Sequence, residues 1–275
     1  MLKSMMKKNW IYLLVLIPFA LIALFPLYWM GIASVKDTSS ILAMPPQWVP
    51  LHPTFENFAS LFRSSKLARW FFNSTFVAVA VTAGNIIFDA MAGYAFAKRK
   101  FAGRRLIFAA MIAGMMIPAQ VTLIPLFLLM VNFGFFDHFT GLIIPSLATP
   151  FGIFLMKQFI ESIPSEFEMA ARLDGASELA LFWRIIFPLS RPAWSMVGLF
   201  HFVGNWNAFL WPLIMTNSEE MRTLPVGLAT LQSQYTIDFG LMMAGAMVTA
   251  MPMFVIFFAF QKQFFAGLNV GGLKS

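Results

Sequence analysis

The sequence contains no cysteine among its 275 residues. Disulfide bonds and cysteine-ligated metal centres are therefore excluded. Charged residues are also scarce: they make up 11% of the chain, whereas a soluble domain has about 25%. A sizeable soluble domain would add many charged residues, so this composition leaves no room for one beside the apolar segments.

Sequence signatures of catalysis are absent as well. No glycine is followed by lysine, so the chain has no P-loop and is not expected to hydrolyse ATP itself. His52, His138 and His201 are far apart and lack the spacing of metal ligands. No serine lies in a nucleophile-elbow context. We therefore expect no enzymatic activity, no metal site and no cofactor bound by this chain.

Hydrophobic residues, in contrast, make up 59% of the chain, and the mean hydropathy is +0.75. Several runs with little or no charge reach, or nearly reach, the roughly 20 residues that a helix needs to cross a bilayer. The first is too long for a signal peptide and lacks a convincing cleavage site. We expect an all-α polytopic membrane protein with one transmembrane domain over residues 1–275. Its six transmembrane helices are predicted at about residues 9–35, 70–97, 106–131, 139–156, 193–215 and 239–260.

The lysines and arginines indicate which connections are cytoplasmic. With the N-terminus inside, fourteen of the nineteen fall on the inner side, and the outer side holds only Lys36, Arg63, Lys66, Arg69 and Arg222. This bias follows the positive-inside rule. We expect both termini to be cytoplasmic in a bacterial or archaeal plasma membrane. The net charge of +7 is then explained by topology, and no nucleic-acid binding is expected.

The longest polar connection is the loop 157–192 between the fourth and fifth predicted spans. Ser165 followed by Glu168 fits a capping box, and Asp174 with Gly175 fits a helix stop. The helix between these signals has about two turns and is too short to be stable alone in water. It is therefore expected to be held by its flanks and by a surface on which it docks.

A second short helix is predicted to begin at Ser177 and to end at Pro188. Two alternatives to docking on a protein are a DNA-reading helix-turn-helix and a solvated loop without a partner. The flanking membrane spans argue against the first.

This loop resembles the EAA loop of the permease subunits of binding-protein-dependent ATP-binding-cassette importers. The family pattern is roughly E-A-A-x-x-D-G-A, followed by I-x-x-P-L-x-x-P. The chain departs from it at Met169, which replaces the glutamate, although Glu168 directly precedes it. By match of position, the resemblance implies ATPase docking by Glu168, Met169, Ala170, Ala171, Asp174, Gly175 and Ala176.

The resemblance extends over most of the chain and is closest to the carbohydrate-uptake class, the second, six-span permease of maltose-type and glycerol-phosphate-type importers. It includes PTFENFASLF at 53–62, AGYAFAKRKFAGRR at 92–105, WNAFLWPL at 206–213 and the ending GLNVGGLKS. The partners that it implies are a second homologous permease, two copies of a cytoplasmic ATPase that carry ATP and Mg²⁺, an extracytoplasmic sugar-binding protein, a sugar substrate and membrane lipid.

One acidic residue, Asp89, lies inside a predicted span, with Asn85 and Gly93 one turn away on the same face. A carboxylate there costs about 2.5–3.5 kcal/mol on insertion scales, so it should face protein or water. It is either a hydrogen-bonded brace or part of a pathway. The second reading allows an alternative function, an ion-coupled secondary transporter that uses Asp89.

A second polar group, Gly204 to Asn207, lies in the fifth predicted span. The amides of Asn205 and Asn207 suit sugar hydroxyls, and the face of Trp206 suits the apolar side of a sugar ring. His201 lies one turn earlier. The alternative is close helix packing, for which membrane interfaces also use glycine and asparagine. A scaffold or receptor without transport would leave this group unexplained.

Overall fold

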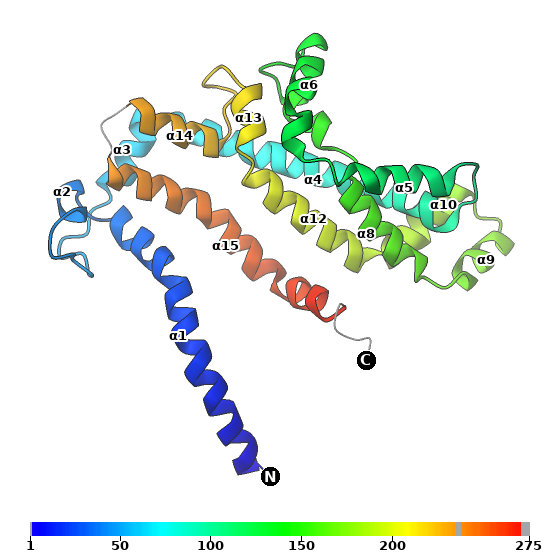
Figure 1. The fold of residues 1–275 in the computed structure, drawn as a ribbon, viewed down its shortest axis with the longest axis horizontal. Helices are drawn as coiled ribbons and strands as arrows, with labels where there is room; N and C mark the ends of the chain where they lie inside the picture. The colour runs from blue at the N-terminus through cyan, green and yellow to red at the C-terminus, as the bar shows by residue number, and fades with distance from the viewer. Residues whose placement is uncertain (1, 235–237, 271–275) are drawn as a thin grey trace. The chain divides into compact units, whose positions relative to one another are not determined.

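The computed structural model describes residues 2–234 and 238–270, and its fold is drawn in Figure 1. Within these ranges every regular element is a helix and no strand occurs, which confirms the all-α prediction. The contacts divide the chain into two compact units, which are described separately. One comprises Met1–Leu67 with Leu228–Phe254, and the other Ala68–Gly227 with Val255–Ser275. Residues 271–275 of the GLNVGGLKS ending lie outside the described ranges.

The first unit contains α1 (Leu2–Ser34), which covers the first predicted span. The short helices α2 (Thr38–Ile41) and α3 (Glu56–Ser64) follow. The buried amide of Asn57 in α3 donates to the carbonyl oxygens of Ser34 at 2.9 Å and Lys36 at 2.7 Å. These bonds satisfy carbonyl groups at and beyond the C-terminal end of α1, which have no partner inside the helix.

The same unit includes the first part of α15 (Phe239–Val270), and its boundary with the second unit also crosses α14 (Leu224–Gln234). Thr38 Oγ1 donates to Asp238 Oδ1 at 3.1 Å. The segment that follows the first predicted span and the start of the last one are thus joined within this unit.

The second unit is built on α4 (Leu67–Lys98), the second predicted span. It also holds the loop for which the family resemblance predicts docking. Its other elements are α5 (Arg104–Gly114), α6 (Ala119–Asn132), α7 (Phe139–Ile143), η1 (Ile144–Ser146), α8 (Pro150–Glu161), α9 (Glu166–Leu173), α10 (Glu178–Leu181), η2 (Phe182–Ile186), α11 (Phe187–Leu189), α12 (Arg191–Trp206) and α13 (Leu210–Met215).

The third predicted span is not one continuous helix. It is divided into α5 and α6, whose axes differ by 102°. Pro118 stands at the break and is the N-cap of α6. Because proline has no N–H and disfavours helical backbone in the residue before it, a helix arriving from Gly114 cannot continue through this point.

The fourth predicted span is also interrupted. Its two halves, Phe139–Ser146 and Pro150–Glu161, are bent by 43°. The helix α8 extends beyond the predicted end of this span near Met156, through Lys157 to Glu161. The ammonium group of Lys157 lies 2.6 Å from the Glu161 carboxylate, an i,i+4 pair that favours another helical turn.

The number of membrane spans stays a prediction. By length and composition, three described helical segments can cross a membrane: Tyr12–Ser34, Leu67–Lys98 and Phe239–Gln261. The two bent pairs raise the number to five if each is one span. The fifth predicted span consists of α12, with 16 residues, and α13, with 6 residues, separated at residues 207–209.

The contacts of α4 show which connections share an end of the second unit. Near the start of α4, Trp70 Nε1 donates to the Glu219 carbonyl at 2.8 Å, and the Asn73 amide donates to the Glu220 carbonyl at 2.6 Å. At its other end, Lys98 Nζ donates to the Ile163 carbonyl at 2.5 Å, where α8 leads into α9. The connection after α13 therefore lies at one end of α4, and the loop 157–192 lies at the other.

Asp137, in the turn between α6 and α7, joins the connection after α13. Its Oδ1 accepts from the backbone N–H groups of Asn217 at 2.8 Å and Ser218 at 3.1 Å. The backbone of Asp137 is left-handed, with φ of 58°, a region that aspartate and asparagine enter more readily than most residues. Burial alone would raise the pKa of this carboxyl, but the hydrogen bonds from Asn217 and Ser218 outweigh it and lower the pKa below its ordinary value.

Substitution of Asp137 by alanine is expected to destabilise the protein by about 2 kcal/mol, the contribution of hydrogen bonds to a charged acceptor. Because the folded pKa is lowered, the carboxylate stabilises the fold above its unfolded pKa, and this stabilisation is lost as the pH falls through the folded pKa. Thermal unfolding of wild type and Asp137→Ala from neutral to acidic pH should give converging midpoints. A difference that grows on acidification would contradict the assignment. Asp137→Asn, which keeps an oxygen acceptor, is the control.

Candidate functional site

The helix α9 ends in a tight turn that needs glycine. The N–H of Gly175 bonds to the Arg172 carbonyl at 3.1 Å, and the N–H of Ala176 bonds to the Ala171 carbonyl at 2.9 Å. This pair of bonds is a Schellman motif, with Gly175 in the left-handed position at φ of 80°. The predicted helix stop is confirmed. The Asp-Gly-Ala sequence therefore has a local role, which is to turn the chain from α9 toward α10.

The predicted capping box at the start of α9 is wrong. Ser165 makes no side-chain capping bond. The side chain of Glu168 instead points to the end of α4, where its carboxylate lies 3.6 Å from Lys98 Nζ and 3.3 Å from an Arg99 guanidinium nitrogen. Charge pairing of a carboxylate that is 11% exposed takes precedence over a weak local cap.

Arg99 connects both short helices of the loop to α4. One of its guanidinium nitrogens lies 2.7 Å from the Glu178 carboxylate at the start of α10, in addition to its contact with Glu168. Its guanidinium carbon also lies 4.6 Å from the centre of the Tyr94 ring. Arg172 approaches the other Glu178 oxygen at 2.6 Å. A planar guanidinium that bridges two carboxylates and packs on a ring fixes orientation in a way that a lysine cannot.

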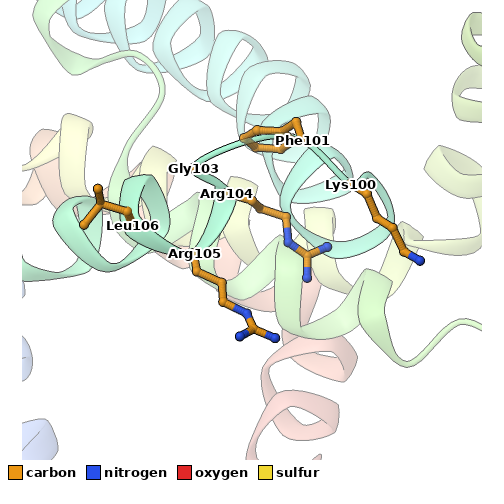
Figure 2. A pocket seen from close by; sticks show the side chains of 6 residues that line it. All are labelled: Lys100, Phe101, Gly103, Arg104, Arg105 and Leu106. Atoms are coloured by element: carbon orange, nitrogen blue, oxygen red, sulfur yellow. The ribbon is translucent and has the colours of Figure 1, made fainter.

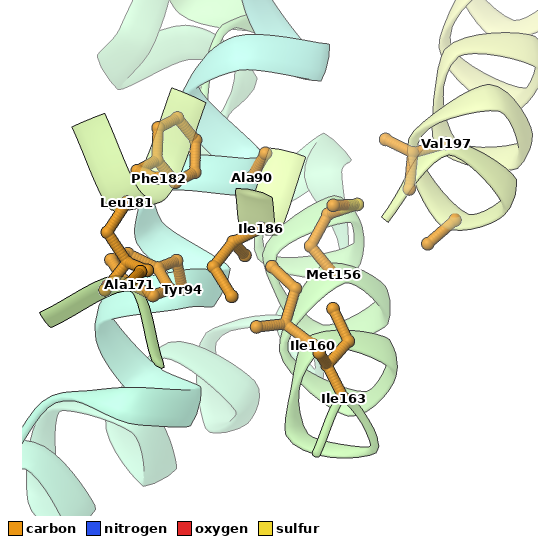
Figure 3. Packing of buried hydrophobic residues seen from close by; sticks show 11 residues of the cluster. Ala90, Tyr94, Met156, Ile160, Ile163, Ala171, Leu181, Phe182, Ile186 and Val197 are labelled. Carbon is orange, nitrogen blue, oxygen red and sulfur yellow. The ribbon is translucent and has the colours of Figure 1, made fainter. Parts of the chain in front are cut away.

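Apolar packing also attaches this loop to the longer helices. Ala171, Leu181 and Ile186 belong to a buried cluster that also includes Tyr94 of α4 and Met156 of α8, as Figure 3 shows. The cluster extends to Val197 of α12. A small residue is required at position 171 because Ala171 is 6% exposed and packs directly against this cluster. The loop is therefore attached to α4, α8 and α12 together.

The opposite face of α9 is apolar and exposed. Met169 and Leu173 have exposed fractions of 54% and 89%, and Phe167 at the edge is 48% exposed. Ala170, Asp174 and Gly175 are exposed as well, whereas Glu168 and Ala171 are buried and Ala176 is half-buried. The seven predicted docking residues thus divide between two faces. We use the term coupling face for the exposed residues Phe167, Met169, Ala170 and Leu173.

The second helix of the loop begins as predicted, with Ser177 Oγ accepting from the N–H of Ala180 at 3.3 Å. Its predicted end at Pro188 is wrong, because the helical path continues to Leu189. The residues before the proline, Phe182–Ile186, form a π-helical turn. A wider turn relieves the clash of the proline ring with the preceding turn of the helix.

Asp89 is fully buried and braces three helices. Its Oδ2 lies 3.1 Å from Nε2 of His201 in α12 and 3.4 Å from Oγ1 of Thr149. Thr149 is the N-cap of α8, where it accepts from the N–H of Gly152 at 3.1 Å. Asn85 makes separate bonds to Ser146 and Ala148 and does not bond to Asp89. The cluster joins α4, α8 and α12, the helices that also share the apolar cluster under α9.

This brace depends on the absence of a side chain at Gly152. A Cβ at that position would lie 1.7 Å from Asp89 Oδ2 and 3.0 Å from His201 Nε2. We expect Gly152→Ala to displace the carboxylate and to destabilise the protein by about 2–3 kcal/mol, in the range of overpacked cores. The midpoint of thermal unfolding in detergent measures this.

Gly31→Ala in α1 is the matched control, because no atom lies within 4 Å of a Cβ there. It should leave stability unchanged or raise it slightly, since alanine favours helix. Equal midpoints for Gly152→Ala and Gly31→Ala would show that α8 does not approach Asp89 in this way.

The polar group of the fifth predicted span lies where α12 ends. Trp206 is the last residue of α12 and is 1% exposed, with its ring 5.5 Å from that of Phe71 and 6.1 Å from that of Phe202. The amide of Asn205 donates to the His201 carbonyl at 2.8 Å, and the exposed Asn207 donates to the Val203 carbonyl at 2.9 Å. His201 does not line the same site, because its ring is bound to Asp89.

The residues that anchor α9 escaped sequence reasoning. The sequence predicted no anchoring role for Lys98, Arg99 or Glu178 and no capping role for Thr149, although Lys98 and Arg99 lie in the family-like stretch 92–105. The available signal was the position of two cations directly after an apolar span, near an acidic loop. No group of metal-ligating side chains occurs in the part of the chain that the structure describes.

These features define a helical multi-pass membrane protein in which a short helix with an exposed apolar face is anchored to the ends of three longer helices. Residues 89–269 match the family described as binding-protein-dependent transport system inner membrane component. The chain belongs to this family. It is a permease component of a transport system and not an enzyme.

Two relatives that match nearly the whole length of the chain are named as permeases for sugar transport or uptake. The chain is 36% identical over 258 residues to the arabinooligosaccharides transport system permease protein AraQ of Bacillus subtilis. This alignment covers 93% of this chain and 92% of that protein. It is 33% identical over 263 residues to the diacetylchitobiose uptake system permease protein NgcG of Streptomyces coelicolor, with coverage of 94% and 87%.

A solved structure has the same fold. A chain of a bacterial ABC transporter involved in the import of the acidic polysaccharide alginate aligns with a TM-score of 0.83 and 25% identity, over 94% of this chain and 97% of that one. The predicted membership in this permease family is confirmed.

Proposed function

We propose that this chain is one membrane-spanning subunit of an ATP-driven importer of sugars. It forms the translocation pathway with a second permease, and its coupling face docks on a cytoplasmic ATPase. The observation that carries the proposal is the exposed apolar face of α9, which opposes a face fixed by Glu168 and Ala171. The apolar side chains on this face stay exposed to solvent unless a partner protein buries them.

The substrate class is inferred from the relatives. The two described above are named for transport of arabinooligosaccharides and of diacetylchitobiose. Both are short glycans, so we infer a sugar or short oligosaccharide as substrate, delivered by an extracytoplasmic binding protein. Two ATPase copies, with their ATP and Mg²⁺, complete the proposed assembly.

The structure offers a physical route from the ATPase to the pathway. A displacement of α9 acts on α4 through Arg99 and Lys98, and on α8 and α12 through the apolar cluster. The brace around Asp89 links the same helices further along. These ion pairs and packing contacts hold α9 and the ends of the three helices together, so we propose that they move as one element between two arrangements. ATP and the loaded binding protein then act on each other by favouring the same arrangement.

The proposed orientation rests on charge. The loop 157–192 and the basic connection after α4 lie at one end of the second unit, and residues 137 and 215–220 lie at the other. If the six predicted spans cross the membrane one after another, successive connections lie on alternate sides, and these connections are divided between the two ends in that way. The basic end is cytoplasmic under the positive-inside rule, as are both termini.

The substrate pathway is proposed near the end of α12. Asn205 and Asn207 offer amides beside a break in the helix. For Trp206, burial against Phe71 and Phe202 favours a supporting role behind this surface. Asp89 is a brace in the described arrangement. The alternative function, an ion-coupled secondary transporter that uses Asp89, gains no support from the family to which the chain belongs.

Purification of the tagged full chain from its native membrane, followed by mass spectrometry of co-purifying proteins, tests the proposal. The expected result is a second homologous permease and an ATPase with a P-loop. A chain that purifies alone, or only with copies of itself, and still transports sugar would overturn it.

A further inference from the structure

The connection between α4 and α5 carries positive charge that carboxylates in the described part of the chain neutralise only in part. Five cations lie between Lys98 and Arg105, and no acidic residue occurs from Ala90 to Phe136. Lys98 and Arg99 have carboxylate partners in the loop 157–192. Lys100 and Arg105 are exposed and have no ion-pair partner among the residues that the structure describes, and Arg104 donates to the Arg99 carbonyl at 2.9 Å.

Lys100, Arg104 and Arg105 line one cavity of about 520 Å³, shown in Figure 2. Lys100 reaches it from the loop, and Arg104 and Arg105 from the first turn of α5. Gly103, which precedes the helix, provides no side-chain cap, and the first turn contains no acidic residue. The positive end of the helix dipole therefore meets two arginines, an arrangement that an anion in the cavity would relieve.

Exposed apolar side chains adjoin these cations. Leu106 and Ile107 have exposed fractions of 75% and 51%, and Phe101 in the loop has 42%. The residues that line the cavity also follow closely after Lys98 in the sequence. Lys98 is the last residue of a helix that is long and apolar enough to span a membrane. A ligand at this position meets positive charge on one side and apolar surface on the other.

We infer that this cavity, formed by Lys100, Arg104 and Arg105, binds the headgroup of an anionic phospholipid. The phosphate pairs with the cations, and the acyl chains lie against Leu106 and Ile107. The inference is independent of the sugar and of the ATPase. A free phosphate matches the charge but leaves the apolar neighbours uncovered. An acidic protein segment could also pair with the cations, but its binding would not depend on the position of the cavity at the end of a membrane span.

The test uses the full chain with the subunits that accompany it, reconstituted in nanodiscs of phosphatidylcholine and phosphatidylglycerol and examined by native mass spectrometry. Neutralising both unpaired cations in Lys100→Gln/Arg105→Gln should weaken phosphatidylglycerol retention about 30-fold, since each cation near an anionic membrane contributes about fivefold. The conserved-charge variant Lys100→Arg/Arg105→Lys should retain the lipid. Arg63→Gln, which removes a cation paired with Glu56 elsewhere, is the matched control.

Three results would overturn the inference. The first is equal phosphatidylglycerol retention in wild type and the double glutamine variant. The second is displacement of the lipid by millimolar inorganic phosphate, which would indicate a site for the free anion. The third is loss of a protein subunit from the double variant with unchanged lipid retention, which would assign the cavity to a protein contact. If the double variant does not fold, a salt titration of lipid retention in wild type decides. Retention that does not fall with salt rules out the charged site.

Discussion

Leu173→Asp is expected to remove the ATPase from the purified protein and to leave the chain folded in the membrane. Leu173 is 89% exposed and lies on the coupling face, so its replacement disturbs no packing within the chain. A charge placed in a desolvated apolar contact should cost about 2 kcal/mol or more, the size of an interface hot spot. This corresponds to an association at least about 30-fold weaker, measurable by titration of the ATPase against the permease.

Two substitutions separate docking from general damage. Leu173→Met keeps an apolar side chain of similar volume and should preserve association. Leu51→Asp introduces the same charge at a leucine that is 72% exposed, in the segment predicted to lie outside the cell. It should leave association unchanged. Normal ATPase binding by Leu173→Asp would show that the coupling face is not the docking surface.

Arg99→Ala is expected to uncouple ATP hydrolysis from sugar uptake. Without the guanidinium, Glu178 keeps only the hydrogen bond from the Tyr94 hydroxyl, at 3.3 Å, as a contact with α4, and Glu168 keeps only Lys98 at 3.6 Å. The coupling face itself is intact, so the ATPase should still bind. Uptake in proteoliposomes should fall tenfold or more, in line with coupling free energies of about 1–3 kcal/mol, while ATPase activity persists.

The matched control for this experiment is Arg63→Ala. Arg63 also forms an ion pair, with Glu56 at 3.6 Å, but both side chains are largely exposed, and such pairs contribute little. Its uptake should equal that of wild type. Arg99→Lys should be intermediate, because an ammonium group cannot bridge two carboxylates with the same geometry. Full uptake by Arg99→Ala would mean that the apolar cluster alone transmits the movement.

Much of this architecture could be predicted from the sequence, because local signals determine it. Apolar runs marked α1, α4 and α15, and the Asp174-Gly175 pair marked the turn after α9. The prolines were less informative. Pro118 breaks a helix, whereas Pro188 is accommodated by a π-helical turn. Sequence alone does not show which of the two responses the backbone takes.

The orientation of α9 could not be predicted from the motif. By sequence Glu168 fits a capping box, but in the structure its carboxylate pairs with Lys98 and Arg99. Its partners Lys98 and Arg99 lie about seventy residues earlier, at the C-terminal end of α4 and directly after it, and no local pattern connects them to Glu168. The same holds for Asp89, whose partners Thr149 and His201 are brought together only by the packing of three helices.

The most direct test of the central claim is uptake by the purified complex in proteoliposomes. Labelled arabinotriose and diacetylchitobiose are suitable probes, with the extracytoplasmic binding protein outside and ATP inside. We expect uptake of at least one sugar that requires both ATP and the binding protein, is insensitive to a protonophore, and is lost in Leu173→Asp. Uptake driven by a proton or sodium gradient, with this chain alone in the membrane, would contradict the account.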